Sequence, residues 1–193
     1  SKRRIAWALG VEDIEEIPSR IKSLLTPEIP TGIIEQVKKI PQLIEFAQYP
    51  PRIVRSGSCQ ELVMPVPDLT RLPVCKCWPK DGGAFFTLPQ VITKGLGDGV
   101  RNVGMYRMQV YDSTTSGMHW HIHHGGSGQF GEYRRADKRM EVAVALGGDP
   151  ALAYSAGSPL PDGIDEYLFA GFLRRKPVEL VHCKTIDLHV PAD

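Results

Sequence analysis

The chain has 193 residues, 42% of them apolar, and its 23 Lys and Arg residues nearly balance its 22 Asp and Glu residues. This length and composition predict one compact globular domain and exclude the collagen-like and disordered classes. No stretch gathers basic residues into a stripe, so we do not expect a nucleic-acid partner. No apolar run approaches the roughly 20 residues that cross a bilayer, so we expect no integral membrane segment.

Four cysteines are too few for a disulfide scaffold of this length. Cys75 and Cys77 have a single residue between them and no second pair follows, which does not match the spacing of a structural zinc site. We therefore expect reduced, partly buried thiols and a cytoplasmic protein.

Residues 1–51 predict a helical segment, which we assign to the tail of an N-terminal region. Apolar residues recur at helical spacing over 11–48. Prolines remove backbone donors and are expected to divide this stretch into three or four short helices. The dividing residues are Pro18, Pro27, Pro30 and Pro41, and Pro50-Pro51 closes the segment.

Beyond Ser56 the pattern changes to short β-type runs separated by glycine-rich turns. Two helices are expected among them, one after the N-cap Asp149 over 150–154 and one over 164–173, with Asp162 and Asp165 in capping-box spacing. Together these elements predict an α+β fold with an antiparallel, barrel-like sheet. The expected strands span 61–66, 84–94, 102–112, 117–123, 141–146 and 178–185.

The histidine-rich stretch 118–124 is the densest chemical signal in the chain. On a strand, His119, His121 and His123 would face one side and His124 the other. Three imidazoles could then converge on a metal or an anion. The alternative is that they are ordinary surface histidines of a sheet.

Asn102 and Arg107 lie in a run that otherwise has the pattern of a buried strand, where a charged side chain needs a partner or a function. A turn position explains Asn102 equally well, and a structural salt bridge explains Arg107. Five positions apart, the two would face opposite sides of a regular strand. Joint action therefore requires a bulge, for which Gly104 is the natural place.

Glu166 lies in the first turn of the second predicted helix, where a carboxylate interacts favourably with the helix dipole. It is also free to serve as a ligand, because the two aspartates before it already supply the cap. An amide oxygen, an imidazole and a carboxylate form a donor set without thiolate, which suits Mn²⁺ or Mg²⁺ better than zinc.

Five blocks of sequence, in order along the chain, resemble the UbiD family of reversible decarboxylases. The likeness covers most of the chain, from about Arg52 to Ala192. The blocks are Cys-Trp-Pro-Lys-Asp at 77–81, Asn-Val-Gly-Met-Tyr-Arg at 102–107, Trp-x-x-His-x-Gly-Gly at 120–126, Val-Ala-Leu-Gly-x-Asp-Pro at 144–150, and Pro-Leu-Pro-Asp-Gly-x-x-Glu-Tyr-x-Phe-Ala-Gly at 159–171.

The resemblance implies a flavin-reductase-like split β-barrel over 52–193, preceded by the short helical segment. Such a domain binds prenylated FMN, with the phosphate anchored through Mn²⁺ and K⁺. By motif position, the metal ligands are Asn102, His123 and Glu166. The resemblance also implies that Gly104, Met105, Tyr106 and Arg107 contact the cofactor, and that Arg107 has a catalytic contact with the substrate carboxylate. Ser158 and Pro159 fall in the segment that holds the phosphate and the monovalent ion. His119, His121 and His124 match no essential family position.

The implied activity is that of a carboxy-lyase, acting on an aromatic or α,β-unsaturated carboxylic acid without net oxidation, with ubiquinone or menaquinone biosynthesis as a setting. The implied partners are the acid, a flavin prenyltransferase that supplies the cofactor, and further copies of the full-length chain in a homo-oligomer. Family members are longer, and this chain stops before the region that carries their catalytic glutamates. We therefore expect a fragment truncated before a C-terminal domain, or a short subunit completed by another chain, and no activity from this chain alone.

Two other functions remain open from the sequence. A cupin-like metalloenzyme would use the histidine strand directly, and it would need a carboxylate near His121 or His123, of which the nearest downstream is Glu132. A non-catalytic module for flavin-phosphate binding or assembly would need no acid or base at all.

Overall fold

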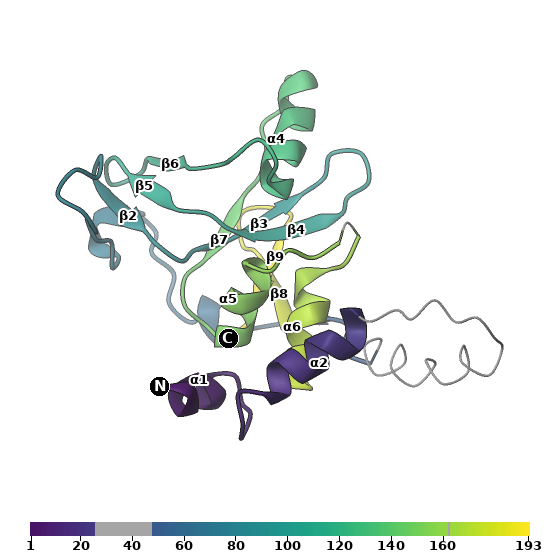
Figure 1. Ribbon diagram of the computed structural model, residues 1–193. Helices are drawn as coiled ribbons and strands as arrows, with labels where there is room; N and C mark the ends of the chain where they lie inside the picture. Colours follow the sequence, from purple (N-terminus) through teal and green to yellow (C-terminus); the bar gives the residue numbers. More distant parts are fainter. Residues whose placement is uncertain (26–47, 162) are drawn as a thin grey trace.

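The structure is a computed structural model that describes residues 1–25, 48–161 and 163–193. A central antiparallel sheet has β3 (Gln90–Lys94) between β4 (Arg101–Met105) and β7 (Ala143–Ala145). Helix α4 (Gly125–Arg135) contacts one face of this sheet, and α5 (Pro150–Ala156) and α6 (Glu166–Arg174) lie against the other (Figure 1). Because both faces are covered, β3 is buried along nearly its whole length.

Two further sheets of three strands flank the central one. In the first, β5 lies between β2 and β6, and in the second, β8 lies between β1 and β9. The pair β1 and β8 is parallel, whereas the other pairs in these two sheets are antiparallel. Their bounds are β1 Arg52–Val54, β2 Ala84–Phe86, β5 Met108–Val110, β6 Ser116–Met118, β8 Glu179–His182 and β9 His189–Pro191, and two short 3₁₀ turns are η1 Ser58–Gln60 and η2 Leu69–Arg71.

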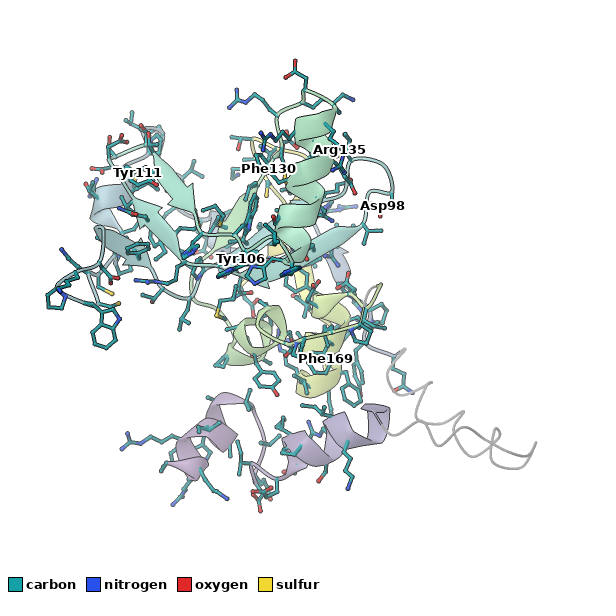
Figure 2. The ribbon with its side chains drawn as sticks, turned by 45° about the horizontal axis from the view of Figure 1, so that its top comes forward. Asp98, Tyr106, Tyr111, Phe130, Arg135 and Phe169 are labelled. Carbon is teal, nitrogen blue, oxygen red and sulfur yellow. The ribbon has the colours of Figure 1, made fainter. Side chains whose placement is uncertain are left out.

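The main core lies between the central sheet, the helices α5 and α6, and strand β8. The first two helices of the chain, α1 (Lys2–Ala8) and α2 (Glu16–Leu25), cover the outer side of α5 and α6 (Figure 1). Phe169 projects from α6 towards them, as Figure 2 shows, and joins their apolar cluster. Burial of such side chains, at about 1.5–3 kcal/mol each, holds the helical segment to the sheet domain.

Both predicted helices after residue 145 are confirmed, and so is the cap of the first; the second begins at Glu166 with Asp165 as its N-cap, while Asp162, the other member of the predicted capping box, lies outside the described residues. The Asp149 carboxylate accepts from the backbone N–H of Ala151, at 2.7 Å, and begins α5. The Asp165 carboxylate accepts from the backbone N–H groups of Tyr167 and Leu168 and begins α6.

The helical character of the N-terminal segment is confirmed for its described part, but Pro18 does not divide it. Pro18 falls in the first turn of α2, where its missing N–H would have had no acceptor in the helix. The helices expected over 26–47 lie outside the described residues.

Five of the predicted strands are shorter than expected or are divided, and two of these, 141–146 and 178–185, shorten to β7 and β8. The 84–94 run splits into β2 and β3 at Leu88-Pro89, because proline has no N–H to continue the ladder. The 102–112 run splits into β4 and β5 at Tyr106 and Arg107, where the chain passes from the central sheet into the sheet of β2, β5 and β6. The 117–123 run ends at Met118.

The strand predicted over 61–66 is wrong. This stretch forms no strand, since Pro65 removes a backbone donor within it and Pro67 removes another directly after it. Helix α4 was not predicted, because it contains four glycines, which lower helix propensity by about 1 kcal/mol each.

The barrel predicted from the sequence is not seen as a closed structure: the strands that the structure describes form three separate sheets. The α+β class is confirmed. Within residues 1–25, 48–161 and 163–193, no helix has the length and apolarity needed to cross a bilayer.

Candidate functional site

A cavity of about 910 Å³ opens between strand β4, the beginning of α4 and the loop that joins α5 to α6. Its walls come from three stretches, 100–106, 123–132 and 156–166, of which 162 is not described. Every site residue implied by the family resemblance lines this cavity except Arg107. The residues brought together in this way are Asn102, Gly104, Met105, Tyr106, His123, Ser158, Pro159 and Glu166.

Glu166 is the least satisfied charged group of the cavity. It is the first residue of α6, and its Oε2 is buried without a hydrogen-bond partner among the described residues. Burial raises the pKa of Glu166 to about 7, although backbone N–H groups of Glu166 and Val103 act in the opposite direction. A buried carboxylate oxygen of this kind is costly unless a cation or a proton compensates for it.

Asn102 lies on β4, opposite Thr93 of β3. Its Nδ2 donates to Thr93 Oγ1 at 3.4 Å, and Thr93 Oγ1 in turn donates to Gln129 Oε1 at 2.7 Å. Gln129 Nε2 donates to the carbonyl of Val100 at 2.9 Å, which fixes the orientation of the Gln129 amide. Because this series of hydrogen bonds uses the amide nitrogen of Asn102, the amide oxygen Oδ1 of Asn102 is left as an acceptor.

The first turn of α4 approaches Asn102 closely. A Cβ on Gly125 would lie 2.2 Å from Asn102 Oδ1, so a side chain at this position would displace the amide. Gly104 is equally constrained, since a Cβ there would lie 2.1 Å from the hydroxyl of Tyr106. These two glycines let the backbone form the cavity wall.

The histidines do not share one strand face, so that prediction is wrong. The strand ends at Met118, and the chain then turns at 121–124 into α4, which separates His123 and His124 from the strand. His123 and His124 line the cavity, whereas His119 stacks on His121 outside it, with ring centres 5.4 Å apart.

Arg107 lies outside the cavity walls. Its Nη2 is 3.1 Å from Asp81 Oδ2, and its Cζ is 4.0 Å from the ring centre of Phe85. The salt bridge considered for Arg107 from its sequence context is therefore present. A contact of Arg107 with a substrate carboxylate stays a prediction.

Sequence reasoning missed Arg101, Thr93 and Gln129. Arg101 forms an ion pair with Asp165, and its Cζ lies 4.9 Å from the ring centre of Tyr167. The sequence signal for Thr93 was that it directly follows two apolar residues of the same strand, Val91 and Ile92, and the structure buries it fully. Gln129 carried none, since its helix was not predicted.

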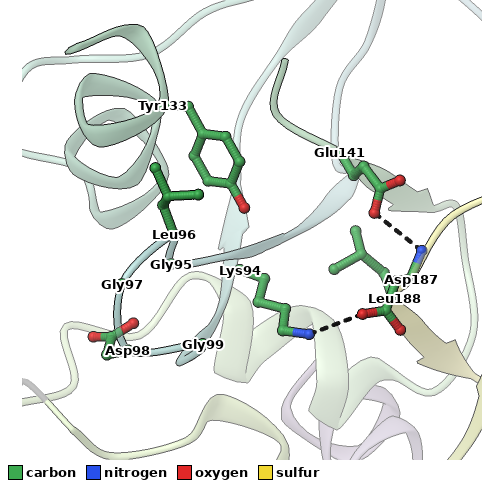
Figure 3. A pocket seen from close by; sticks show the side chains of 10 residues that line it. All are labelled: Lys94, Gly95, Leu96, Gly97, Asp98, Gly99, Tyr133, Glu141, Asp187 and Leu188. Atoms are coloured by element: carbon green, nitrogen blue, oxygen red, sulfur yellow. Dashed lines mark hydrogen bonds and ion pairs between the residues drawn. The ribbon is translucent and has the colours of Figure 1, made fainter. Parts of the chain in front are cut away.

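A second hollow, of about 410 Å³, lies at the turn between β3 and β4, as Figure 3 shows. Lys94 Nζ lies 3.1 Å from Asp187 Oδ2 there, and Glu141 Oε2 accepts from the Asp187 backbone N–H at 3.0 Å. No candidate site residue lines it.

The donor set of the larger cavity fits a hard divalent cation. The described residues contain no group of three His, Cys, Asp or Glu side chains placed to hold a metal ion. Asn102, His123 and Glu166 instead offer an amide oxygen, an imidazole and a carboxylate to one cavity, one from each of its three wall stretches. The uncompensated Oε2 of Glu166 is the feature that a bound cation would satisfy.

Comparison with known proteins decides the family of this chain. The model of the UbiD family, described as the 3-octaprenyl-4-hydroxybenzoate carboxy-lyase Rift-related domain, matches residues 52–193. The chain belongs to the UbiD family.

Two relatives of this UbiD-family chain match it over its full length. An uncharacterized protein of Aquifex aeolicus is 45% identical over 194 residues, and one of Archaeoglobus fulgidus is 43% identical. The chain spans 40% of the length of each of these relatives.

Solved structures of UbiD-class enzymes share the fold of the whole chain. An evolved dimeric form of HmfF from Pelotomaculum thermopropionicum, in complex with prFMN, is 26% identical with a TM-score of 0.79, and the match covers 41% of that protein. The apo 3,4-dihydroxybenzoic acid decarboxylase AroY of Klebsiella pneumoniae is 26% identical with a TM-score of 0.75, and 37% of it is covered.

Proposed function

We propose that this chain is the cofactor-binding portion of a UbiD-like carboxy-lyase that decarboxylates an aromatic or α,β-unsaturated carboxylic acid reversibly. The observation that carries the proposal is the cavity into which eight of the nine candidate residues converge. The complex of HmfF with prFMN supports prenylated FMN as the occupant. The bound flavin would supply the electron sink that decarboxylation requires.

The proposed Mn²⁺ ligands are Asn102 Oδ1, an imidazole nitrogen of His123 and the Glu166 carboxylate. The cation would compensate the buried charge of Glu166 and bind the cofactor phosphate on its open side. In this role the two hydrogen bonds that link Gln129, Thr93 and Asn102 hold the Asn102 amide with its oxygen towards the cavity. Two cavity glycines, Gly104 and Gly125, let the backbone approach the bound group.

The segment at Ser158 and Pro159 is proposed to hold K⁺ through carbonyl oxygens. Its backbone N–H groups from Gly157 to Leu160 already donate within the chain, and Pro159 has none. The Ser158 hydroxyl donates to the carbonyl of Tyr154 at 2.7 Å. Acceptors rather than donors therefore remain, which favours a monovalent cation over direct contact with a phosphate.

The larger context is proposed on the same basis. Residues 52–193 would form the split-barrel domain, with the three described sheets as its parts, and 1–51 would be the tail of an N-terminal region. In the whole enzyme, a flavin prenyltransferase would supply the cofactor in the cytoplasm, and the chain would form a homo-oligomer. Quinone biosynthesis stays a prediction from the family resemblance.

The proposal is tested by retention of metal and flavin. We expect the chain, co-produced with a flavin prenyltransferase, to be purified with Mn²⁺ and flavin absorbance. His123→Ala should lose both, whereas His121→Ala, whose side chain lies outside the cavity, should retain them. Equal losses in the two variants would overturn the ligand assignment, and a colourless wild-type protein would overturn the proposed cofactor.

A further inference from the structure

Cys75 and Cys77 place two thiols side by side on the protein surface. Their Sγ atoms are 3.8 Å apart and both residues are exposed. Cys75 forms an isolated antiparallel bridge with Phe85, so its backbone is extended, and side chains two positions apart on an extended chain face the same side. The proposed decarboxylase site uses neither thiol.

The geometry lies within reach of a disulfide. A disulfide has an S–S length of about 2.05 Å, so the sulfur atoms must approach each other by roughly 1.75 Å from their 3.8 Å separation. A ring closed over one intervening residue removes little chain entropy, so such a bond adds little stability. Exposed disulfides of this kind are the readily reduced ones, unlike the buried bridges of secreted proteins.

The two thiols belong to the loop that precedes β2, and a residue of the same loop, Asp81, binds the side chain of Arg107. The backbone N–H of Trp78 donates to Asp81 Oδ2 at 3.2 Å, and Arg107 donates to the same oxygen at 3.1 Å. At the other end of the loop, the backbones of Cys75 and Phe85 exchange two hydrogen bonds of 3.2 and 3.0 Å. Arg107 lies over the Phe85 ring, so it contacts both ends of the loop.

The surroundings of the loop also affect the pKa of the Cys77 thiol. The hydrogen bond with the Cys75 thiol raises the pKa of Cys77, and the nearby positive charge of Arg107 acts in the opposite direction. Cys77 and Arg107 are thus coupled electrostatically as well as through the backbone.

We propose that Cys75 and Cys77 form a dithiol site that hydrogen peroxide oxidises to a disulfide and that a thiol reductant restores, and that this change reaches Arg107 through the Asp81 loop. One thiolate attacks a peroxide oxygen, which gives a sulfenic acid and water, and the second thiol displaces a second water to form the S–S bond. Two thiol hydrogens are lost and one peroxide is reduced to two waters. The oxidation does not depend on the proposed decarboxylase function, whereas any effect on turnover rests on the proposed role of Arg107.

The oxidation is tested by mass spectrometry in the Cys59→Ser/Cys183→Ser background, which leaves only the two thiols of interest. Hydrogen peroxide should remove two hydrogens, about 2 Da, and dithiothreitol should restore them. Adding Cys75→Ser or Cys77→Ser to this background should abolish that loss. Oxygen additions of about 16 or 32 Da in place of the 2 Da loss, or only disulfide-linked dimers, would overturn the proposal.

Coupling to Arg107 is tested by equilibrating the same background protein with glutathione buffers. If disulfide formation affects the ion pair of Arg107 with Asp81, then removing that pair must in turn affect disulfide formation, because linkage is reciprocal. The quantity measured is the ratio of reduced to oxidised glutathione at which half of the protein carries the disulfide. Arg107→Gln and Asp81→Asn should each release the loop and shift this ratio by about fivefold or more, towards easier disulfide formation. Arg55→Gln changes an exposed arginine outside the loop and should leave the ratio unchanged. If Asp81→Asn and Arg107→Gln are half-oxidised at the same glutathione ratio as Arg55→Gln, the coupling is overturned.

Discussion

The guanidinium Nη2 of Arg107 lies 3.1 Å from Asp81 Oδ2, and the side chain of Asp81 is only 13% exposed. Arg107 also covers the ring of Phe85, so its planar group is held on one side by a charge and on one face by an aromatic ring. This arrangement gives Arg107 a stabilising role in the sheet of β2, β5 and β6, independent of any substrate.

We expect Arg107→Ala to lower the free energy of unfolding by about 1–2 kcal/mol, because it removes a partly buried ion pair and a cation–π contact. Arg107→Lys should cost less, since it keeps the charge. Urea titration measures both, with Arg55→Ala as an exposed control that should stay within about 0.5 kcal/mol of the wild type. If Arg107→Ala is as stable as the control, the Asp81 pair contributes nothing and only a role towards substrate remains.

Gly125→Ala should disrupt the cavity without unfolding α4. Its new Cβ would lie 2.2 Å from Asn102 Oδ1, so the proposed metal ligand must move. Gly131→Ala is the matched control on the same helix, because its Cβ would meet only the end of the Arg135 side chain, at 3.4 Å. Isothermal titration with Mn²⁺ should show weaker binding for Gly125→Ala alone, while Gly131→Ala should stabilise the helix by about 1 kcal/mol. Unchanged Mn²⁺ affinity in Gly125→Ala would remove Asn102 from the ligand set.

Glu166 should make the metal-free chain less stable as the pH rises. Its pKa is about 7 in the folded state and near 4.5 in the unfolded state, so the folded state binds the extra proton between these values. The free energy of unfolding should therefore fall across this range, by an amount on the order of 3 kcal/mol, and level off above pH 7. Glu166→Gln should flatten the profile in buffer that contains EDTA. A wild-type profile parallel to that of the variant would contradict the burial of this carboxylate.

Thr93→Val should weaken Mn²⁺ binding through Asn102, which loses the acceptor of its Nδ2. It should also cost about 1–3 kcal/mol of stability, because Gln129 Oε1 is left without its donor. Thr93→Ser keeps the hydroxyl and should keep the Mn²⁺ affinity. Titration with Mn²⁺ beside urea unfolding separates the two effects, and equal affinities for the Val and Ser variants would show that Thr93 does not orient Asn102.

The parts of the fold that were predicted correctly depend on local chemistry. Asp149 and Asp165 begin their helices because an aspartate accepts from N–H groups two and three positions ahead, whatever the rest of the chain does. Helix α4 was missed because its glycines weaken the local preference, and the contact of Gly125 with Asn102 that explains one of them is long-range. The histidine strand was extended too far for a similar reason, since the turn after Met118 follows from how α4 packs on the central sheet.

The candidate residues that line the cavity were named through the ordered motifs of the family resemblance and not through spacing. Asn102 and Glu166 come from different elements, β4 and α6, and no periodicity links them. The hydrogen-bonded chain from Gln129 to Asn102 joins α4 to two strands, so it could be seen only once these elements were placed. Local sequence also favoured a partner for Arg107, but it could not indicate that Asp81, 26 positions earlier, supplies it.

The cavity walls come from three separate stretches of the chain, 100–106, 123–132 and 156–166. An unfolded chain cannot hold these stretches together, so anything that binds there binds the folded state alone. Each ligand then raises the free energy of unfolding by an amount set by the ratio of its concentration to its Kd, about 2.7 kcal/mol when that ratio is 100. A rise in melting temperature can therefore rank flavins, divalent cations and carboxylic acids as ligands of this chain before any reaction has been assayed.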